Sequence, residues 1–119
     1  MSIERIEAGP RMSQAVVHGN MVYLAGVVAD ERANASAAEQ TAQILARIDA
    51  LLAKAGSDKS RLLSATIWLR DIAYYDALNS VWDKWVLPGQ TPARACVEAR
   101  MAAPDILVEI QVTASRLEA

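Results

Sequence analysis

The chain has 119 residues, of which 53% are hydrophobic and 22% charged, and its 12 basic and 14 acidic side chains leave a formal charge of −2. This length suits a single domain over residues 1–119, and no Lys/Arg run forms the basic stripe of a nucleic-acid-binding protein. The longest apolar run, 21–29, is too short to cross a bilayer, and residues 1–10 lack the features of a signal peptide.

The chain contains one cysteine, Cys96, and one histidine, His18. A single cysteine cannot form a disulfide within the chain, and a free thiol suits a reducing compartment, so we expect a cytoplasmic protein. With one residue of each kind, a Cys/His metal site within one chain is not expected.

Two strands joined by a tight turn are predicted near the N-terminus, over residues 14–18 and 21–25. Both segments are rich in β-branched and aromatic residues, and only Gly19-Asn20 separates them. A two-residue loop of this kind tolerates the positive φ that hairpin turns demand. A short strand over residues 3–6 is expected before them, ending at Gly9-Pro10.

A long amphipathic helix is predicted to begin at Ser36. Ser36 and Glu39 have the spacing of a capping box, in which each side chain satisfies a free amide at the helix start. Gly56 supplies the left-handed residue that ends many helices. Between these limits, residues recurring every three or four positions form one stripe: Ala37, Thr41, Ile44, Ile48, Leu51, Leu52 and Ala55.

Four further elements follow this helix. We expect a strand over 62–69, a helix over 73–86, and two strands over 93–101 and 106–114. The order is therefore β-β-β-α-β-α-β-β, which predicts a two-layer α+β domain with an antiparallel-rich sheet and both helices on one face.

The other face of this sheet has no element of the same chain to cover it. The high apolar content has two explanations: many alanines, or surface that is buried between subunits. Because an uncovered apolar sheet face in so small a chain favours the second explanation, we expect an oligomer.

The stretch 91–98 carries the strongest candidates for chemistry. Arg94 and Cys96 lie two apart in a predicted strand, so both side chains point to the same face. A guanidinium there needs an anion, which is either a protein carboxylate in a structural ion pair or a carboxylate carried by a ligand. Cys96 is either a small buried residue of the strand or a part of the same site.

Glu109 is the remaining candidate. The alternation of Val108, Ile110 and Val112 places Glu109 on the opposite face of the last strand from these apolar residues. The carboxylate is either simply solvated, as on many sheets, or acts as a general acid/base that positions a water. Other known motifs, such as a phosphate loop or a nucleophile elbow, are absent from the sequence.

Taken together, the chain resembles the RidA family, also called YjgF/YER057c/UK114. Its short length and Trp-rich second helix look most like the YoaB-like branch. The likeness spans nearly the whole chain and is carried by the segments 19–26, 39–41, 55–56, 65–71, Asn79 with Trp82, 92–98 and 108–110.

This resemblance implies a chorismate-mutase-like homotrimer with a ligand cleft between each pair of neighbouring subunits. It implies hydrolytic deamination of reactive 2-imino acids or enamines to 2-oxo acids and ammonia, without a cofactor. By the same resemblance, Arg94 would bind the substrate carboxylate, Cys96 would lie beside the imine nitrogen, and Glu109 would orient or deprotonate the attacking water.

The pocket mouth departs from the usual pattern of the family. Active members usually carry a hydroxyl before the glycine that matches Gly26, where this chain has Ala25. The pocket-closing tyrosine of the family has no clear counterpart, and Met12 or Ser13 falls near its place. The resemblance thus implies substrate contacts from Ala25, Gly26 and Met12 at a more apolar mouth. The alternative function is non-catalytic binding of a 2-oxo or related carboxylic acid in the same cleft.

Ribonuclease and chaperone roles have also been attached to this family. We rank them lower, because the acidic balance offers no surface for nucleic acid and the single histidine rules out a ribonuclease-like pair.

Overall fold

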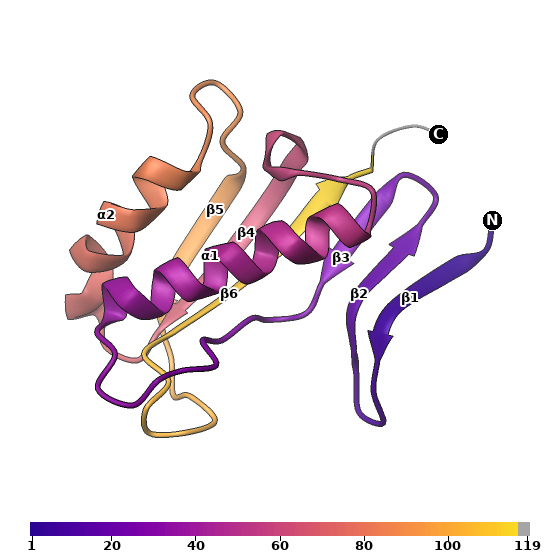
Figure 1. Ribbon diagram of the computed structural model, residues 1–119. Helices are drawn as coiled ribbons and strands as arrows, with labels where there is room; N and C mark the ends of the chain where they lie inside the picture. Colours follow the sequence, from indigo (N-terminus) through magenta and orange to yellow (C-terminus); the bar gives the residue numbers. More distant parts are fainter. Residues whose placement is uncertain (117–119) are drawn as a thin grey trace.

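Six strands form one mixed sheet, and two helices lie side by side on one of its faces, in the computed structural model, which describes residues 1–116 (Figure 1). The predicted fold class and element order are confirmed. The strands are β1 (Ile3–Ala8), β2 (Ser13–His18), β3 (Met21–Leu24), β4 (Leu62–Leu69), β5 (Ala93–Glu98) and β6 (Val108–Ser115), and the helices are α1 (Ala37–Lys54) and α2 (Tyr75–Trp85).

The strand order across the sheet is β1-β2-β3-β6-β4-β5. All neighbours are antiparallel except β4 and β5, which run parallel. The last strand of the chain is therefore inserted in the middle of the sheet, and β5 forms one edge. This order places the strands of Arg94 and Glu109 on either side of β4.

The predicted hairpin and the capping box of α1 are both confirmed. Gly19 has φ +60° in the turn between β2 and β3. The Ser36 hydroxyl accepts from the Glu39 amide at 3.1 Å, and the Glu39 carboxylate accepts from the Ser36 amide at 3.3 Å. Gly56, at φ +78°, follows the end of the helix as expected.

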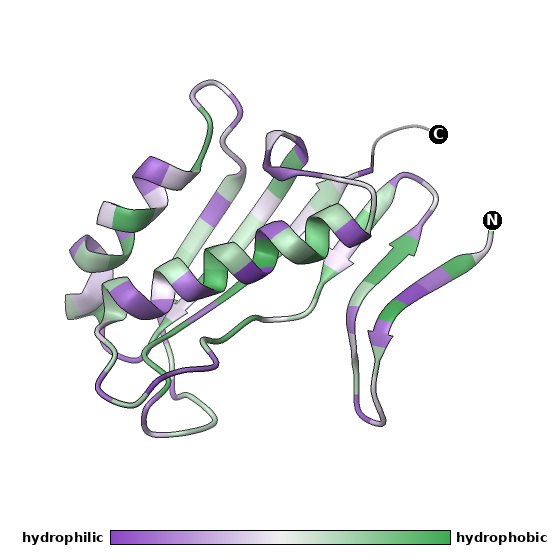
Figure 2. Cartoon of the chain, in the orientation of Figure 1, coloured by the Kyte–Doolittle hydropathy of each residue, from purple (hydrophilic) through white to green (hydrophobic). Residues whose placement is uncertain are grey.

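The apolar stripe predicted for α1 is buried over its whole length, as are Leu45 and Gln40, which were not assigned to it. Figure 2 shows both helices alternating between hydrophobic and hydrophilic residues. In α2 the buried residues are Leu78, Trp82 and Trp85, and the Trp85 indole donates to Asp49 of α1 at 3.0 Å. None of the helices in residues 1–116 has the length and apolarity to span a membrane.

Several predicted boundaries are wrong by two or three residues. Asp71 caps a short 3₁₀ turn over Ile72–Tyr74, and α2 begins only after it. Strand β5 ends at Glu98 rather than at residue 101, and β6 begins at Val108 rather than at residue 106. β5 ends and β6 begins at these residues because β4, the strand that pairs with both of them, ends at Leu69.

The sheet face away from the helices is uncovered within the chain, as expected, but the prediction that it is apolar is wrong. Alternation along the strands directs hydroxyl and amide side chains to this face together with a few large apolar ones. Two of its hydroxyls, Ser64 and Thr113, hydrogen-bond each other at 2.6 Å. Tyr23 and Val97 remain about half exposed.

Candidate functional site

Arg94 lies on edge strand β5 and points toward α2. Its Nη1 donates to the Asn79 Oδ1 at 2.8 Å, and its Nη2 donates to the Tyr75 hydroxyl at 3.2 Å. The central guanidinium carbon lies 5.4 Å from the ring centre of Trp82 and 5.7 Å from that of Tyr75. These three partners are spaced i, i+4 and i+7 along α2, so one face of the helix holds the guanidinium.

All of these partners are electrically neutral. No Asp or Glu among residues 1–116 forms an ion pair with Arg94, so the structural ion pair that the sequence left open is not present in this part of the chain. Two of the five guanidinium N–H groups are used, and the others remain for a ligand. Among residues 1–116, the Arg94 guanidinium is thus oriented by neutral groups and has no anionic partner.

Cys96 lies on the same face of β5 as Arg94, which confirms the predicted alternation. The parallel register pairs Arg94 with Ala65 and Cys96 with Ile67, and both partners are buried under the helices. Burial raises the pKa of the Cys96 thiol, and the positive charge of Arg94 offsets this only in part. The thiol is therefore neutral near pH 7, which does not suit a covalent nucleophile.

Glu109 lies on the opposite face of the sheet, against Gly26. A Cβ atom added at Gly26 would stand 2.1 Å from the Glu109 Oε2, so the carboxylate occupies the space that any side chain there would need. Within residues 1–116 the Glu109 carboxylate has no hydrogen bond or ion pair, and the Gly26 amide has no hydrogen-bond acceptor. A free donor and a free acceptor therefore lie next to each other.

Gly26 also lines a cavity of about 280 Å³ at the end of the β1–β2 hairpin. Met12, about half exposed, lines the same cavity. Ala25 does not line it, and its amide donates to the Gln14 carbonyl at 2.9 Å. The cavity is bounded by Met12, Gln14, Gly26, Val27, Val28, Asp30 and Arg47.

One chain does not bring all the predicted site residues together. Trp68 of β4 pairs with Glu109 on one side and Val97 on the other, so Glu109 and Val97 share a face, while Cys96 and Arg94 alternate to the other face. The candidate residues thus form two separate clusters, here called half-sites: Arg94 and Cys96 under α2, and Gly26 and Glu109 on the uncovered face.

A family model described as "Endoribonuclease L-PSP" matches residues 2–116. The structure of NMB1025 from Neisseria meningitidis, described as a member of the YjgF protein family, superposes with a TM-score of 0.96 at 49% identity, covering 100% of this chain and 98% of that one. The chain belongs to the YjgF family.

Two curated relatives in the YjgF (RidA) family are informative. The RutC family protein YoaB of Escherichia coli K12 is 46% identical over 115 residues, covering 97% of this chain and 99% of that protein, which supports the YoaB-like branch. The 3-aminoacrylate deaminase RutC of Acinetobacter baylyi is 35% identical over 96 residues, covering 76% and 75%. The family therefore includes a named deaminase.

Sequence reasoning missed the partners of Arg94. In the sequence, Asn79 and Trp82 stand out only through the family resemblance, and Tyr75 does not stand out at all. Trp82 does pack in the core, but its ring also lies beside the guanidinium. The i, i+4, i+7 spacing of an aromatic, an amide and an aromatic was the available signal for this contact.

Proposed function

We propose that the chain deaminates small 2-imino acids or enamines, in a site where the Arg94 half of one copy meets the Gly26–Glu109 half of another. The observation that carries this proposal is Arg94, a fixed cation with only neutral partners among the described residues. A planar guanidinium with free donors binds a carboxylate bidentately, and 2-imino acids carry that group next to the reacting carbon.

The remaining groups fit the hydrolysis. Water adds to the imine carbon, the C=N bond is cleaved after proton transfer to nitrogen, and the products are a 2-oxo acid and ammonia. Glu109 accepts the proton of the attacking water and returns it to the leaving nitrogen. The free amide of Gly26 donates to substrate, and Cys96 contributes a neutral thiol rather than a covalent bond. We expect this chemistry to occur in the cytoplasm.

The deaminase named among the relatives supports the same reaction class. The alternative is a protein that binds a 2-oxo acid through Arg94 without turnover. Its support is Ala25, which stands at the position where active family members usually carry a hydroxyl beside the glycine. Both functions require Arg94 to bind the carboxylate, and they differ only in whether the bound molecule is then hydrolysed.

The test generates 2-imino acids in situ with an amino-acid oxidase and traps the surviving imine with semicarbazide. Wild-type protein should lower the trapped fraction, and Arg94→Met should lose about 100-fold in this activity because the charged anchor is gone. Arg100→Met is the matched control, since it removes a positive charge from an exposed position six residues along the chain. This control should behave as wild type.

Binding of a 2-oxo acid, measured by calorimetry, separates the two functions. Binding that depends on Arg94 with no effect on imine lifetime would favour the alternative. If Arg94→Met left both deamination and binding unchanged, the site assignment would be wrong.

A further inference from the structure

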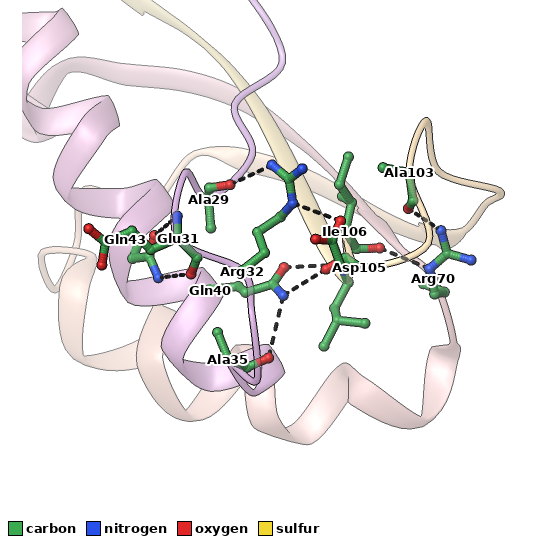
Figure 3. Close-up of polar contacts among 11 residues, drawn as sticks. Ala29, Glu31, Arg32, Ala35, Gln40, Gln43, Arg70, Ala103, Asp105 and Ile106 are labelled. Atoms are coloured by element: carbon green, nitrogen blue, oxygen red, sulfur yellow. Dashed lines mark hydrogen bonds and ion pairs between the residues drawn. The ribbon is translucent and has the colours of Figure 1, made fainter.

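The loop over residues 99–107 joins the two half-sites along the chain. It crosses the end of β4 and connects β5, which carries Arg94, to β6, which carries Glu109. Figure 3 shows side chains from three other segments in contact with this loop, and two of them, Gln40 and Arg70, bind its backbone. Such a degree of anchoring is unusual for a surface connection, because loops ordinarily leave much of their backbone to solvent.

Gln40, in the first turns of α1, is the buried member of this network. Its side chain is only 1% exposed, and its amide uses both ends on the loop. The Nε2 donates to the Asp105 carbonyl at 2.9 Å, and the Oε1 accepts from the Leu107 amide at 3.0 Å. Leu107 lies two residues before Glu109, so this hydrogen bond holds the backbone immediately before β6.

Two arginines complete the anchoring. Arg70, just after β4, donates from Nε to the Ile106 carbonyl at 3.0 Å and from Nη2 to the Ala103 carbonyl at 2.5 Å. Arg32 pairs with the Asp105 carboxylate at 2.9 Å and donates to the Ala29 carbonyl at 2.9 Å (Figure 3).

The segment on the Gly26 side is held from the same helix. Gln43, one turn after Gln40, donates to the Glu31 carbonyl at 2.7 Å and accepts from the Glu31 amide at 3.0 Å. Val27 forms reciprocal backbone hydrogen bonds with Ile110 at 2.8 and 3.0 Å. Both segments that meet at the Gly26–Glu109 contact are thus held by side chains from the first turns of α1.

We infer that Gln40 is a positioning residue: through Leu107 it holds the Glu109 carboxylate against Gly26. Arg70 supports the same loop from the end of β4. This inference rests on the proposed function, since it assigns Gln40 a role in the reaction of Glu109. It predicts that losing the Gln40 amide harms proton transfer more than it harms binding of the substrate carboxylate, which Arg94 provides.

The test replaces Gln40 by Met, which keeps the length of the side chain and removes both hydrogen bonds. We expect kcat in the imine assay to fall about 10- to 100-fold, while the Kd of a 2-oxo acid stays within about threefold of wild type. A fall in Tm of about 5–10 °C is also expected, since two backbone groups lose their partners. Assays are therefore run well below the lowered Tm.

Two matched controls separate positioning from loss of stability. Thr41→Val removes another fully buried hydrogen bond of α1, from the Thr41 hydroxyl to the Ala37 carbonyl at 2.7 Å, without touching the loop. Ser57→Ala removes a hydrogen bond to Ser115 at the far end of β6. Both should lower Tm and keep kcat near wild type. If they lowered kcat as much as Gln40→Met does, the role of Gln40 would be structural only.

Gln40→Glu covers the case in which Gln40→Met does not fold. It keeps an acceptor for the Leu107 amide and loses the donor to the Asp105 and Ala35 carbonyls. It should therefore retain more kcat than Gln40→Met or, if Gln40→Met fails to fold, than Arg70→Met.

A readout independent of turnover is the NMR signal of the Glu109 side-chain carboxyl and of the Gly26 amide. Gln40→Met, or Gln40→Glu in its place, should shift both signals, and Ser57→Ala should shift neither. An inactive wild-type protein would overturn the proposed function alone, and unshifted signals would overturn the positioning role.

Discussion

At the scale of single residues, the environment of Arg94 decides what this side chain can do. An ion pair with a carboxylate of the same chain would have neutralised it, and its contribution to stability at a half-exposed site would have been small. Instead an amide and two aromatic rings orient the cation without neutralising it. Such a charge attracts an external anion, and no free energy is spent on orienting the guanidinium when that anion binds.

Gly26 is predicted to be required for its small size rather than for its backbone conformation. In Gly26→Ala the added methyl would stand 2.1 Å from the Glu109 Oε2, so the carboxylate must move. We expect turnover to fall about tenfold or more, while stability changes by less than about 1 kcal/mol, because the displaced atom is the end of a flexible side chain. The imine assay and urea unfolding measure the two effects.

Gly9→Ala is the control for this substitution. A methyl there would meet its nearest neighbour, the Met12 carbonyl oxygen, at an ordinary 3.4 Å. It should leave turnover unchanged. Wild-type turnover in Gly26→Ala would mean that the position of Glu109 does not matter to the reaction.

Cys96 should be unreactive at neutral pH. Burial raises the pKa of its thiol, so the thiolate is scarce and alkylation by iodoacetamide should be slower than that of free cysteine. The folded state holds the thiol proton more tightly than the unfolded state does. The contribution of this group to the free energy of unfolding is therefore fully present below the ordinary thiol pKa, and it is lost as the pH rises through the pKa of the folded state. Cys96→Ser should reduce that alkaline loss in urea unfolding and retain most turnover. Rapid alkylation at pH 7 would contradict the assignment of a neutral thiol.

At the scale of elements, α1 has two functions that its sequence encodes separately. The residues of its apolar stripe pack on the sheet and stabilise the fold. Its first turns carry the capping box and the two glutamines that hold neighbouring loops. The stripe and the cap follow from local spacing, and both were predicted. The Gln40 contacts join residues 65 and 67 positions apart in the chain, and the Gln43 contacts join residues 12 apart, which local spacing cannot reveal.

The cap of α1 can be tested by Ser36→Ala. This substitution leaves the Glu39 amide without its acceptor, so we expect a loss of about 1 kcal/mol in the free energy of unfolding, measured in urea. Ser80→Ala, which removes an exposed hydroxyl that bonds within α2, should be neutral or slightly stabilising. Equal losses in the two variants would mean that the cap has no special role.

At the scale of the whole molecule, the sheet separates the two half-sites. Arg94 and Cys96 share the helix-covered face, whereas Glu109 lies on the other. Since a side chain cannot reach through a packed sheet, a site that needs both groups must combine two copies of the chain. The β5 edge, where Val97 is about half exposed, is the part of the Arg94 strand that can approach a second copy.

Mixed oligomers test this arrangement directly. Arg94→Met and Glu109→Gln should each be inactive alone. When they are unfolded and refolded together in equal amounts, random assembly in a cyclic oligomer should restore about a quarter of wild-type turnover, because that share of sites receives both intact residues. Light scattering reports the oligomeric state. A mixture that stays inactive, or a wild-type protein that is active as a monomer, would contradict a shared site.

The sequence by itself determined the elements and their faces, because hydrophobic period, capping and turn residues act over a few neighbouring positions. It also placed Arg94 and Cys96 on one face of their strand, and Glu109 on the face of the last strand that points away from Ile110. Only the tertiary structure decided that β6 lies between β3 and β4, that Arg94 has neutral partners, and that Glu109 meets Gly26. Those outcomes depend on which distant segments pair, and pairing is set by the energy of the whole packed domain rather than by any local pattern.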